Sequence, residues 1–172
     1  MKKLLSLLVS LTLCLCAAAM AETEAELPTM EIAPSYEAYT LPLGESGFTL
    51  DIPGEWLVYE DLPEGAVALF SDEDQAILLQ VNIVEMDIAS IAAEVVAQAE
   101  NNEIKDLFEC MINKLYYLTY TSLDDTMNIA YAPLTDTHSI VFIFTTSDPA
   151  RYAESTLPLE IIGSIALAET AE

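Results

Sequence analysis

The chain has 172 residues, of which 29 are Asp or Glu and 5 are Lys or Arg, and its formal net charge is −24. Nucleic acids and anionic membrane surfaces are bound mainly through Lys and Arg, so this composition argues against both as partners. A protein partner or a cationic ligand stays open, although an acidic exterior commonly serves only to keep an exported protein soluble.

The N-terminal 21 residues are typical of a secretory signal peptide. Lys2 and Lys3 precede an apolar run that ends at Leu15, and the Ala-Met-Ala sequence before Glu22 matches an A-x-A cleavage site. We expect a secreted protein cut near Ala21-Glu22, whose charge becomes −26 when two lysines are lost from the total of −24. Retention by this segment is the alternative, but the run is shorter than the ~20 residues that span a bilayer.

Cleavage leaves Cys110 as the only cysteine, so no disulfide forms within the mature chain. Cys110 stands in an apolar stretch without a neighbouring His or Arg that would stabilise a thiolate, and we expect it to be buried and structural. Cys14 and Cys16 lie in the leader. A lipid anchor at Cys16 is a second alternative to release, although Leu15 stands where bacterial lipoprotein signals usually have a small residue.

Residues 22–43 carry several Glu and Pro and few large apolar residues, which is typical of a flexible acidic linker. We expect one folded domain over 44–168 and a short C-terminal tail over 169–172. Strand signals follow at 48–52, 56–59, 66–70 and 77–84, with turns at Pro53-Gly54 and at Pro63-Glu64-Gly65.

The apolar period changes after Glu85, where Asp87 is a good N-cap for a helix that we expect to run to about Asn101. A last helix begins at Asp148-Pro149, and Pro158 predicts a kink or restart within it. Between these helices, three strands are predicted at 114–121, 127–132 and 138–145, the first two joined by a turn at Asp124-Asp125. This order predicts an α+β domain with an antiparallel sheet flanked by helices.

Three short segments resemble the PsbP-like superfamily. Residues 47–56, Gly-Phe-Thr-Leu-Asp-Ile-Pro-Gly-Glu-Trp, resemble its opening Gly-Phe-x-φ-x-φ-Pro-x-x-Trp, where φ is apolar, and 112–114 and 161–165 resemble its central hairpin and its closing segment. The resemblance covers about 44–168 and departs from the usual pattern at Lys114, where Gly is expected. It implies an α/β/α sandwich. It implies little about activity, because the members are non-catalytic: an extrinsic photosystem subunit, a Ran-binding import factor and many uncharacterised bacterial secreted proteins, the branch that this chain resembles.

No catalytic or cofactor motif stands out. His138 is the only histidine, and no G-x-S-x-G or similar nucleophile motif accompanies it. Zinc sites of the usual kinds need several His or Cys, and the scattered glycines form no phosphate loop. We expect Trp56 to anchor the core or a turn rather than to bind a sugar. The sequence therefore predicts neither a catalytic residue nor a cofactor.

Calcium is the one ion that the composition leaves open, because it prefers carboxylate oxygens. The candidate ligands are Asp72, Glu73 and Asp74 in one acidic group and Asp124 and Asp125 in another. Neither group has the D-x-[DN]-x-[DN]-G spacing of a calcium loop, and adjacent acidic residues are more often a solvated turn.

Two kinds of function remain after these exclusions. The favoured one is a secreted, non-enzymatic binding or accessory module with a protein partner, for which Tyr116, Tyr120 and Tyr131 are possible contact residues. Those tyrosines could equally cap the core. The alternatives are a small secreted hydrolase that uses a carboxylate pair and a calcium-stabilised binding module. The sequence predicts no oligomeric state.

Overall fold

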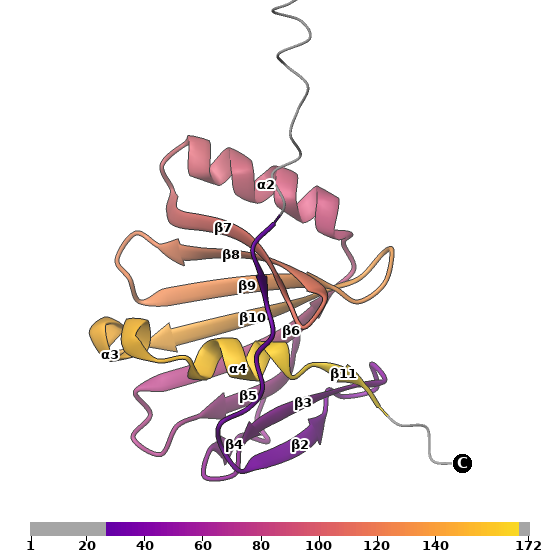
Figure 1. Cartoon of the computed structure of the whole chain (residues 1–172), viewed down its shortest axis with the longest axis vertical. Helices are drawn as coiled ribbons and strands as arrows, with labels where there is room; N and C mark the ends of the chain where they lie inside the picture. The colour runs from indigo at the N-terminus through magenta and orange to yellow at the C-terminus, as the bar shows by residue number, and fades with distance from the viewer. Residues whose placement is uncertain (1–26, 169–172) are drawn as a thin grey trace, which may run out of the picture.

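The computed structural model describes residues 27–168, which form two sheets and three helices (Figure 1). All neighbouring strands are antiparallel except β1 and β7. The large sheet has the order β1 (Thr29–Met30), β7 (Ile104–Ile112), β8 (Leu115–Ser122), β9 (Met127–Pro133), β10 (Ser139–Thr146), β6 (Ile77–Val84), β5 (Ala66–Ser71) and β4 (Leu57–Val58). The small sheet has the order β11 (Ala166–Leu167), β3 (Phe48–Pro53) and β2 (Ala38–Pro42). The helices are α2 (Ile88–Glu100), α3 (Pro149–Glu154) and α4 (Leu157–Gly163).

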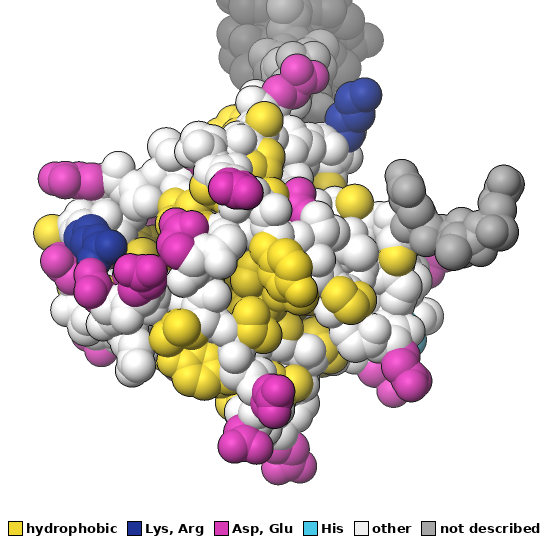
Figure 2. Space-filling model, turned by 90° about the horizontal axis from the view of Figure 1, so that it is seen from below, with side chains coloured by type: hydrophobic (Ala, Val, Ile, Leu, Met, Phe, Trp, Pro, Cys, Tyr) yellow, Lys and Arg dark blue, Asp and Glu magenta, His cyan; other side chains and the backbone are white. Residues whose placement is uncertain are grey.

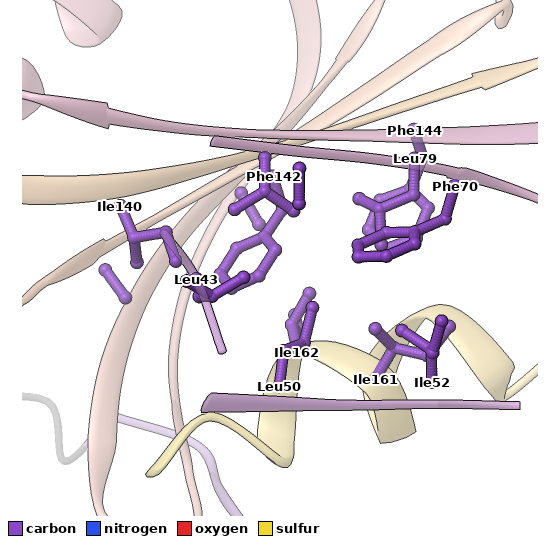
Figure 3. Packing of buried hydrophobic residues seen from close by; sticks show 14 of the residues in the cluster. Leu43, Leu50, Ile52, Phe70, Leu79, Ile140, Phe142, Phe144, Ile161 and Ile162 are labelled. Atoms are coloured by element: carbon purple, nitrogen blue, oxygen red, sulfur yellow. The ribbon is translucent and has the colours of Figure 1, made fainter. Parts of the chain in front are cut away.

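The main core lies between the large sheet on one side and the small sheet with α4 on the other. Alternate residues of a strand point to opposite faces, so the large apolar residues at every second position of β6 and β10 share one face. Figure 3 shows Phe142 and Leu79 of the large sheet pointing toward Leu50 of β3 and Ile161 and Ile162 of α4. Burial of these side chains is the main force that joins the layers.

Helix α2 covers the opposite face of the large sheet. Asp87 caps it by accepting a hydrogen bond from the backbone nitrogen of Ser90 at 2.9 Å. Ile91 and Val95 recur at helical spacing and pack against Leu118 of β8. The predicted helix behind Asp87 and its packing on a sheet are confirmed, as is an antiparallel sheet with helices on both sides.

The C-terminal helical region is divided in two, as Pro158 predicts. Asp148 caps α3 by accepting from the backbone nitrogen of Arg151 at 3.1 Å, and the helix ends at Glu154. Helix α4 begins at Leu157, so Pro158 lies in its first turn, where a missing backbone N–H is tolerated. This break makes α3 and α4 two separate short helices.

The predicted flexible linker over 22–43 is wrong for its described part. Residues 29–30 and 38–42 form β1 and β2, and Leu43 is fully buried in the main core. The segment is held by tertiary contacts, including the pairing of Thr29 with Met111. Strand β7 was not predicted either.

Several predictions concern residues outside 27–168. The signal peptide over 1–21, a lipid at Cys16 and the tail over 169–172 lie beyond the described residues. Within the described range, no helix has the length and apolar character of a membrane-spanning segment.

Candidate binding surface around helix α3

The three tyrosines predicted as partner contacts lie on the sheet face that carries α2. Tyr116, Tyr120 and Tyr131 are half-buried and pack against the hydrophobic cluster of α2 and β8. The rings of Tyr120 and Tyr131 are stacked with centroids 6.2 Å apart. Burial, with Glu109 nearby, raises the pKa of Tyr116 to about 12. The structure therefore uses these rings to pack α2 on the sheet.

The first acidic group lies in the loop between β5 and β6. Asp72 is 7% exposed, and its Oδ1 accepts a hydrogen bond from the backbone nitrogen of Ile77 at 3.0 Å. Arg151 of α3 extends to this loop, with Nη2 3.4 Å from Asp72 Oδ2 and Nη1 3.8 Å from Asp74 Oδ2. The loop is therefore fixed from within, and a cation from another part of the chain lies beside it.

The second acidic group forms the turn between β8 and β9. Asp124 accepts hydrogen bonds from the Ser122 hydroxyl at 2.7 Å and the Thr126 hydroxyl at 2.8 Å, and these bonds lower its pKa to about 2. Asp125 pairs with Lys105 Nζ at 2.7 Å. Within residues 27–168, no three acidic, His or Cys side chains converge as a metal site would require.

The other residues that the sequence singled out are His138, Cys110 and Trp56, and each contacts other parts of the protein itself. His138 Nδ1 lies 2.9 Å from the hydroxyl of Thr137 and 3.5 Å from that of Thr135, both in its own turn. Cys110 is buried in the main core, as predicted, and burial raises the pKa of its thiol. Trp56 belongs to the same core.

A groove lies between the large sheet and the two C-terminal helices, α3 and α4. Its volume is about 230 Å³. Thr119, Thr121 and Asn128 of β8 and β9 line the sheet side, and Thr121 donates a hydrogen bond to Asn128 Oδ1 at 2.9 Å. Tyr152 and Leu159 line the helical side. The groove thus has polar groups on its sheet side and an apolar helical side.

Two further hollows adjoin this groove, one on each side of α3. The first shares Thr121 and Tyr152 with the groove and carries Asp106 and Asp125. The second shares Ser155 with the groove and carries the acidic loop after β5. We call the groove and these two hollows together the α3 surface; its centre is largely apolar and both ends are acidic. In Figure 2, one basic side chain is surrounded by acidic ones at the side of the molecule where α3 lies.

Sequence reasoning did not predict the α3 surface. The available signal was a change along β8, where the side that faces the core carries Leu115 and Tyr117 and then Thr119 and Thr121. Polar residues on a core-facing side indicate that this side becomes accessible at that end of the strand. The opposite wall comes from α3, about 30 residues later in the chain, and no local pattern connects the two.

No protein-family model and no curated protein sequence matches the chain. Among solved structures, the solution structure of cyanobacterial PsbP (CyanoP) from Synechocystis sp. PCC 6803 matches with a TM-score of 0.51 and 13% identity, over 76% of this chain and 91% of that one. A crystal structure from Bacteroides thetaiotaomicron VPI-5482 matches with a TM-score of 0.49 and 15% identity, over 81% of this chain and 51% of that one. The CyanoP match confirms the PsbP-like fold that the sequence resemblance implies, and at this identity it concerns the fold alone.

Proposed function

We propose that this chain, which has a PsbP-like fold, is a secreted accessory module that binds a protein partner through the α3 surface and catalyses no reaction. The fold itself suggests an accessory or binding module. The observation that carries the finer proposal is the α3 surface, where a groove of about 230 Å³ with an apolar side lies between two acidic hollows. A partially apolar groove with a charged rim is typical of a site that recognises another protein.

The charge distribution favours a partner with basic residues. Residues 27–168 contain only Lys105, Lys114 and Arg151 as Lys or Arg. Lys105 is paired with Asp125, and Arg151 lies beside the acidic loop. The surplus of carboxylates speeds association with a cationic surface and disfavours acidic partners.

The carboxyl groups with displaced pKa values take part in hydrogen bonds within the chain. Asp87, Asp124 and Glu160 have lowered pKa values, because each accepts hydrogen bonds that favour its ionised form. A hydrolase with a carboxylate pair needs one acid that keeps its proton near neutral pH, which requires a raised pKa. The hydrolase alternative is tested directly by assaying the purified protein on glycoside and ester substrates.

The binding proposal is tested by photo-crosslinking in the cells that make the protein. A photoreactive amino acid is placed at Ala153, which is exposed in the groove, or at Val96, which is exposed on α2. We expect a defined protein adduct from position 153, weaker at high salt, and none from position 96. Equal adducts from both positions, or none from 153, would contradict the proposal.

Export is tested separately by mass spectrometry of the culture medium. Cleavage at the predicted site gives a mature chain that begins at Glu22, whereas a lipid anchor at Cys16 would leave the protein in the membrane fraction with an added acyl mass. Recovery of the uncleaved chain inside the cell would contradict secretion.

A further inference from the structure

One hollow of the α3 surface combines an acidic lining with a buried carboxylate. Its volume is about 260 Å³, and its lining includes Glu55, Trp56, Asp72, Glu73, Asp74 and Arg151. We call it the acidic pocket. The residues come from the turn before β4, the loop after β5 and helix α3, so four carboxylates and one guanidinium from three separate parts of the chain line one pocket.

Asp72 has a carboxylate oxygen without a hydrogen-bond partner. The residue is 7% exposed; Oδ1 accepts from Ile77, whereas Oδ2 is buried and accepts no hydrogen bond from the described residues. The nearest cation is Arg151 Nη2 at 3.4 Å, and this residue also lines the pocket. Oδ2 therefore lies on the Arg151 side of the carboxylate, and Asp72 and Arg151 both line the pocket. A buried carboxylate oxygen that lacks a donor is costly, so this atom points to a donor supplied from outside the chain.

The orientation of Asp72 is fixed by its own loop. Its backbone nitrogen donates to the Ile77 carbonyl at 3.1 Å, and its carbonyl accepts from the Gln75 nitrogen at 3.0 Å. With Oδ1 also held by Ile77, the carboxylate has little freedom to turn Oδ2 elsewhere. The acceptor is preorganised, so the protein loses little conformational entropy when a ligand binds.

Arg151 holds its place in the pocket only weakly. Its side chain is 52% exposed, and its distances of 3.4 Å to Asp72 and 3.8 Å to Asp74 are those of an ion pair without a short hydrogen bond. Exposed ion pairs of this kind contribute little to stability. A competing cation with better geometry can therefore displace it.

We propose that the acidic pocket receives a basic side chain of the protein partner, a lysine ammonium or an arginine guanidinium, which displaces Arg151 and donates a hydrogen bond to Asp72 Oδ2. This inference rests on the proposed function and names the partner chemistry that the α3 surface recognises. Both basic groups carry several N–H donors, and the charge of Asp74 and Glu73 is available to balance theirs. A divalent metal fits less well, because no three ligands converge within residues 27–168.

The fluorescence of Trp56 measures binding to the acidic pocket. It is the only tryptophan in the chain and it lines the acidic pocket, so its fluorescence reports on what enters. The exported protein is titrated at low ionic strength with acetyl-Gly-Lys-Gly-amide and acetyl-Gly-Arg-Gly-amide. The control peptide carries norleucine, which has the apolar stem of lysine without the ammonium group. We expect a saturable change in Trp56 emission with the two basic peptides and none with norleucine.

Arg151→Gln tests displacement. Because Arg151 competes for the same carboxylates, its removal is expected to tighten peptide binding by about two- to fivefold, the size of an exposed ion pair. Lys114→Gln removes the same charge from the turn after β7, outside the pocket, and is the matched control. We expect it to leave the affinity within about twofold, since screening weakens distant charges.

Asp72→Asn tests the acceptor. The amide oxygen can still accept from Ile77, whereas the amide nitrogen replaces Oδ2, so binding is expected to weaken at least about tenfold. Asp74→Asn gives a second test if the first variant unfolds, because the Asp74 side chain is 81% exposed. That change is expected to weaken binding about two- to fivefold.

Two results would overturn the pocket proposal. One is equal tightening of peptide binding by Arg151→Gln and Lys114→Gln. The other is no change in Trp56 emission with either basic peptide, whether or not 1 mM calcium chloride produces one. The crosslinking experiment at Ala153 separates this failure from failure of the proposed function. A partner adduct without peptide binding retains the partner and removes the pocket, whereas loss of both removes both proposals.

Discussion

Asn113 and Gly163 are joined by a hydrogen bond of 2.8 Å from the side-chain nitrogen of the first to the carbonyl oxygen of the second. The same nitrogen donates to the Ile32 carbonyl at 2.7 Å, and Asn113 Oδ1 accepts from the Ile32 nitrogen at 2.9 Å. One side chain in the turn between β7 and β8 thus connects the N-terminal segment with the end of α4. These bonds explain why the N-terminal segment, which the sequence predicts to be a flexible linker, is held against the domain.

Replacing Asn113 by Ala removes all three hydrogen bonds. Each bond is worth about 0.5–1.5 kcal/mol, and an alanine at the observed φ of 49° adds about 1 kcal/mol of backbone strain. We expect Asn113→Ala to lower the free energy of unfolding by about 2.5–5.5 kcal/mol, measured by urea denaturation. Asn102→Ala is the matched control, because Asn102 has a similar φ of 57° and its side chain bonds to no other described residue. Equal losses would show that strain alone matters.

Gly163 lies too close to its neighbours for a larger residue. An added Cβ would lie 2.9 Å from Ile112 Cγ2 and 3.3 Å from Asn113 Nδ2. Ile112 is fully buried and has little room to move. We expect Gly163→Ala to lower the free energy of unfolding by about 1–3 kcal/mol. Gly54→Ala is the control: its added Cβ would meet only the Glu37 carbonyl oxygen, at 3.5 Å, and we expect it to change the free energy of unfolding by less than about 1 kcal/mol. A neutral Gly163→Ala would contradict the packing described here.

Lys114 occupies a backbone conformation that favours glycine. Asn113 and Lys114 have φ values of 49° and 70°, which is the geometry of a two-residue hairpin turn that prefers Asn-Gly. We expect Lys114→Gly to stabilise the protein by about 0.5–1 kcal/mol, because relief of strain exceeds the added freedom of the unfolded chain. Lys114→Gln keeps the strain and removes the charge, so calorimetry on both variants separates the two effects. If Lys114→Gln raises the free energy of unfolding as much as Lys114→Gly does, the stabilisation comes from removal of the charge and not from relief of strain.

The elements that the sequence predicts well have strong local signals. Strand β6 alternates apolar and polar residues, and α2 follows a capping aspartate. Strand β7 lacks such a pattern, because Asp106 has a φ of 53° and the pairing with β8 shifts between Lys105 and Phe108. This irregularity interrupts the alternation on which strand prediction depends. Strands β1 and β2 are short and are defined by their partners rather than by their own sequence.

The candidate site is harder to predict, because its residues are distant in the sequence. The acidic loop at Asp72 was identified as a group of charges, but its neighbours Glu55 and Arg151 belong to other elements. The tyrosines of β8 and β9 were identified from composition, and the structure places them beneath α2. Strand alternation indicates which residues share a face, but it does not indicate which part of that face a helix covers.

Glu160 connects α4 to the N-terminal segment and makes stability depend on pH. It is 6% exposed, and its carboxylate accepts hydrogen bonds from Ser35 N at 2.7 Å, Ser35 Oγ at 2.8 Å and Thr156 Oγ1 at 2.7 Å. The bond from the Ser35 backbone and those from the two hydroxyls lower the pKa of Glu160. The folded state therefore binds this proton less readily than the unfolded state. The resulting stabilisation is complete above the unfolded pKa of about 4.3 and is lost as pH falls through the lower folded pKa.

We expect Glu160→Gln to lower the free energy of unfolding by about 1–3 kcal/mol at pH 7, because the amide nitrogen cannot accept the bonds that a carboxylate oxygen accepts. The difference from the natural protein should narrow at pH 3, because this pH is below the unfolded pKa of about 4.3 and the unfolded chain takes up the proton there. Glu154→Gln, in the exposed last turn of α3, is the control and should change stability by less than about 0.5 kcal/mol at either pH. Urea denaturation of the natural protein, Glu160→Gln and Glu154→Gln at pH 7 and pH 3 measures these differences in the free energy of unfolding. A loss for Glu160→Gln that is the same at pH 7 and pH 3 would show that its charge does not hold the N-terminal segment.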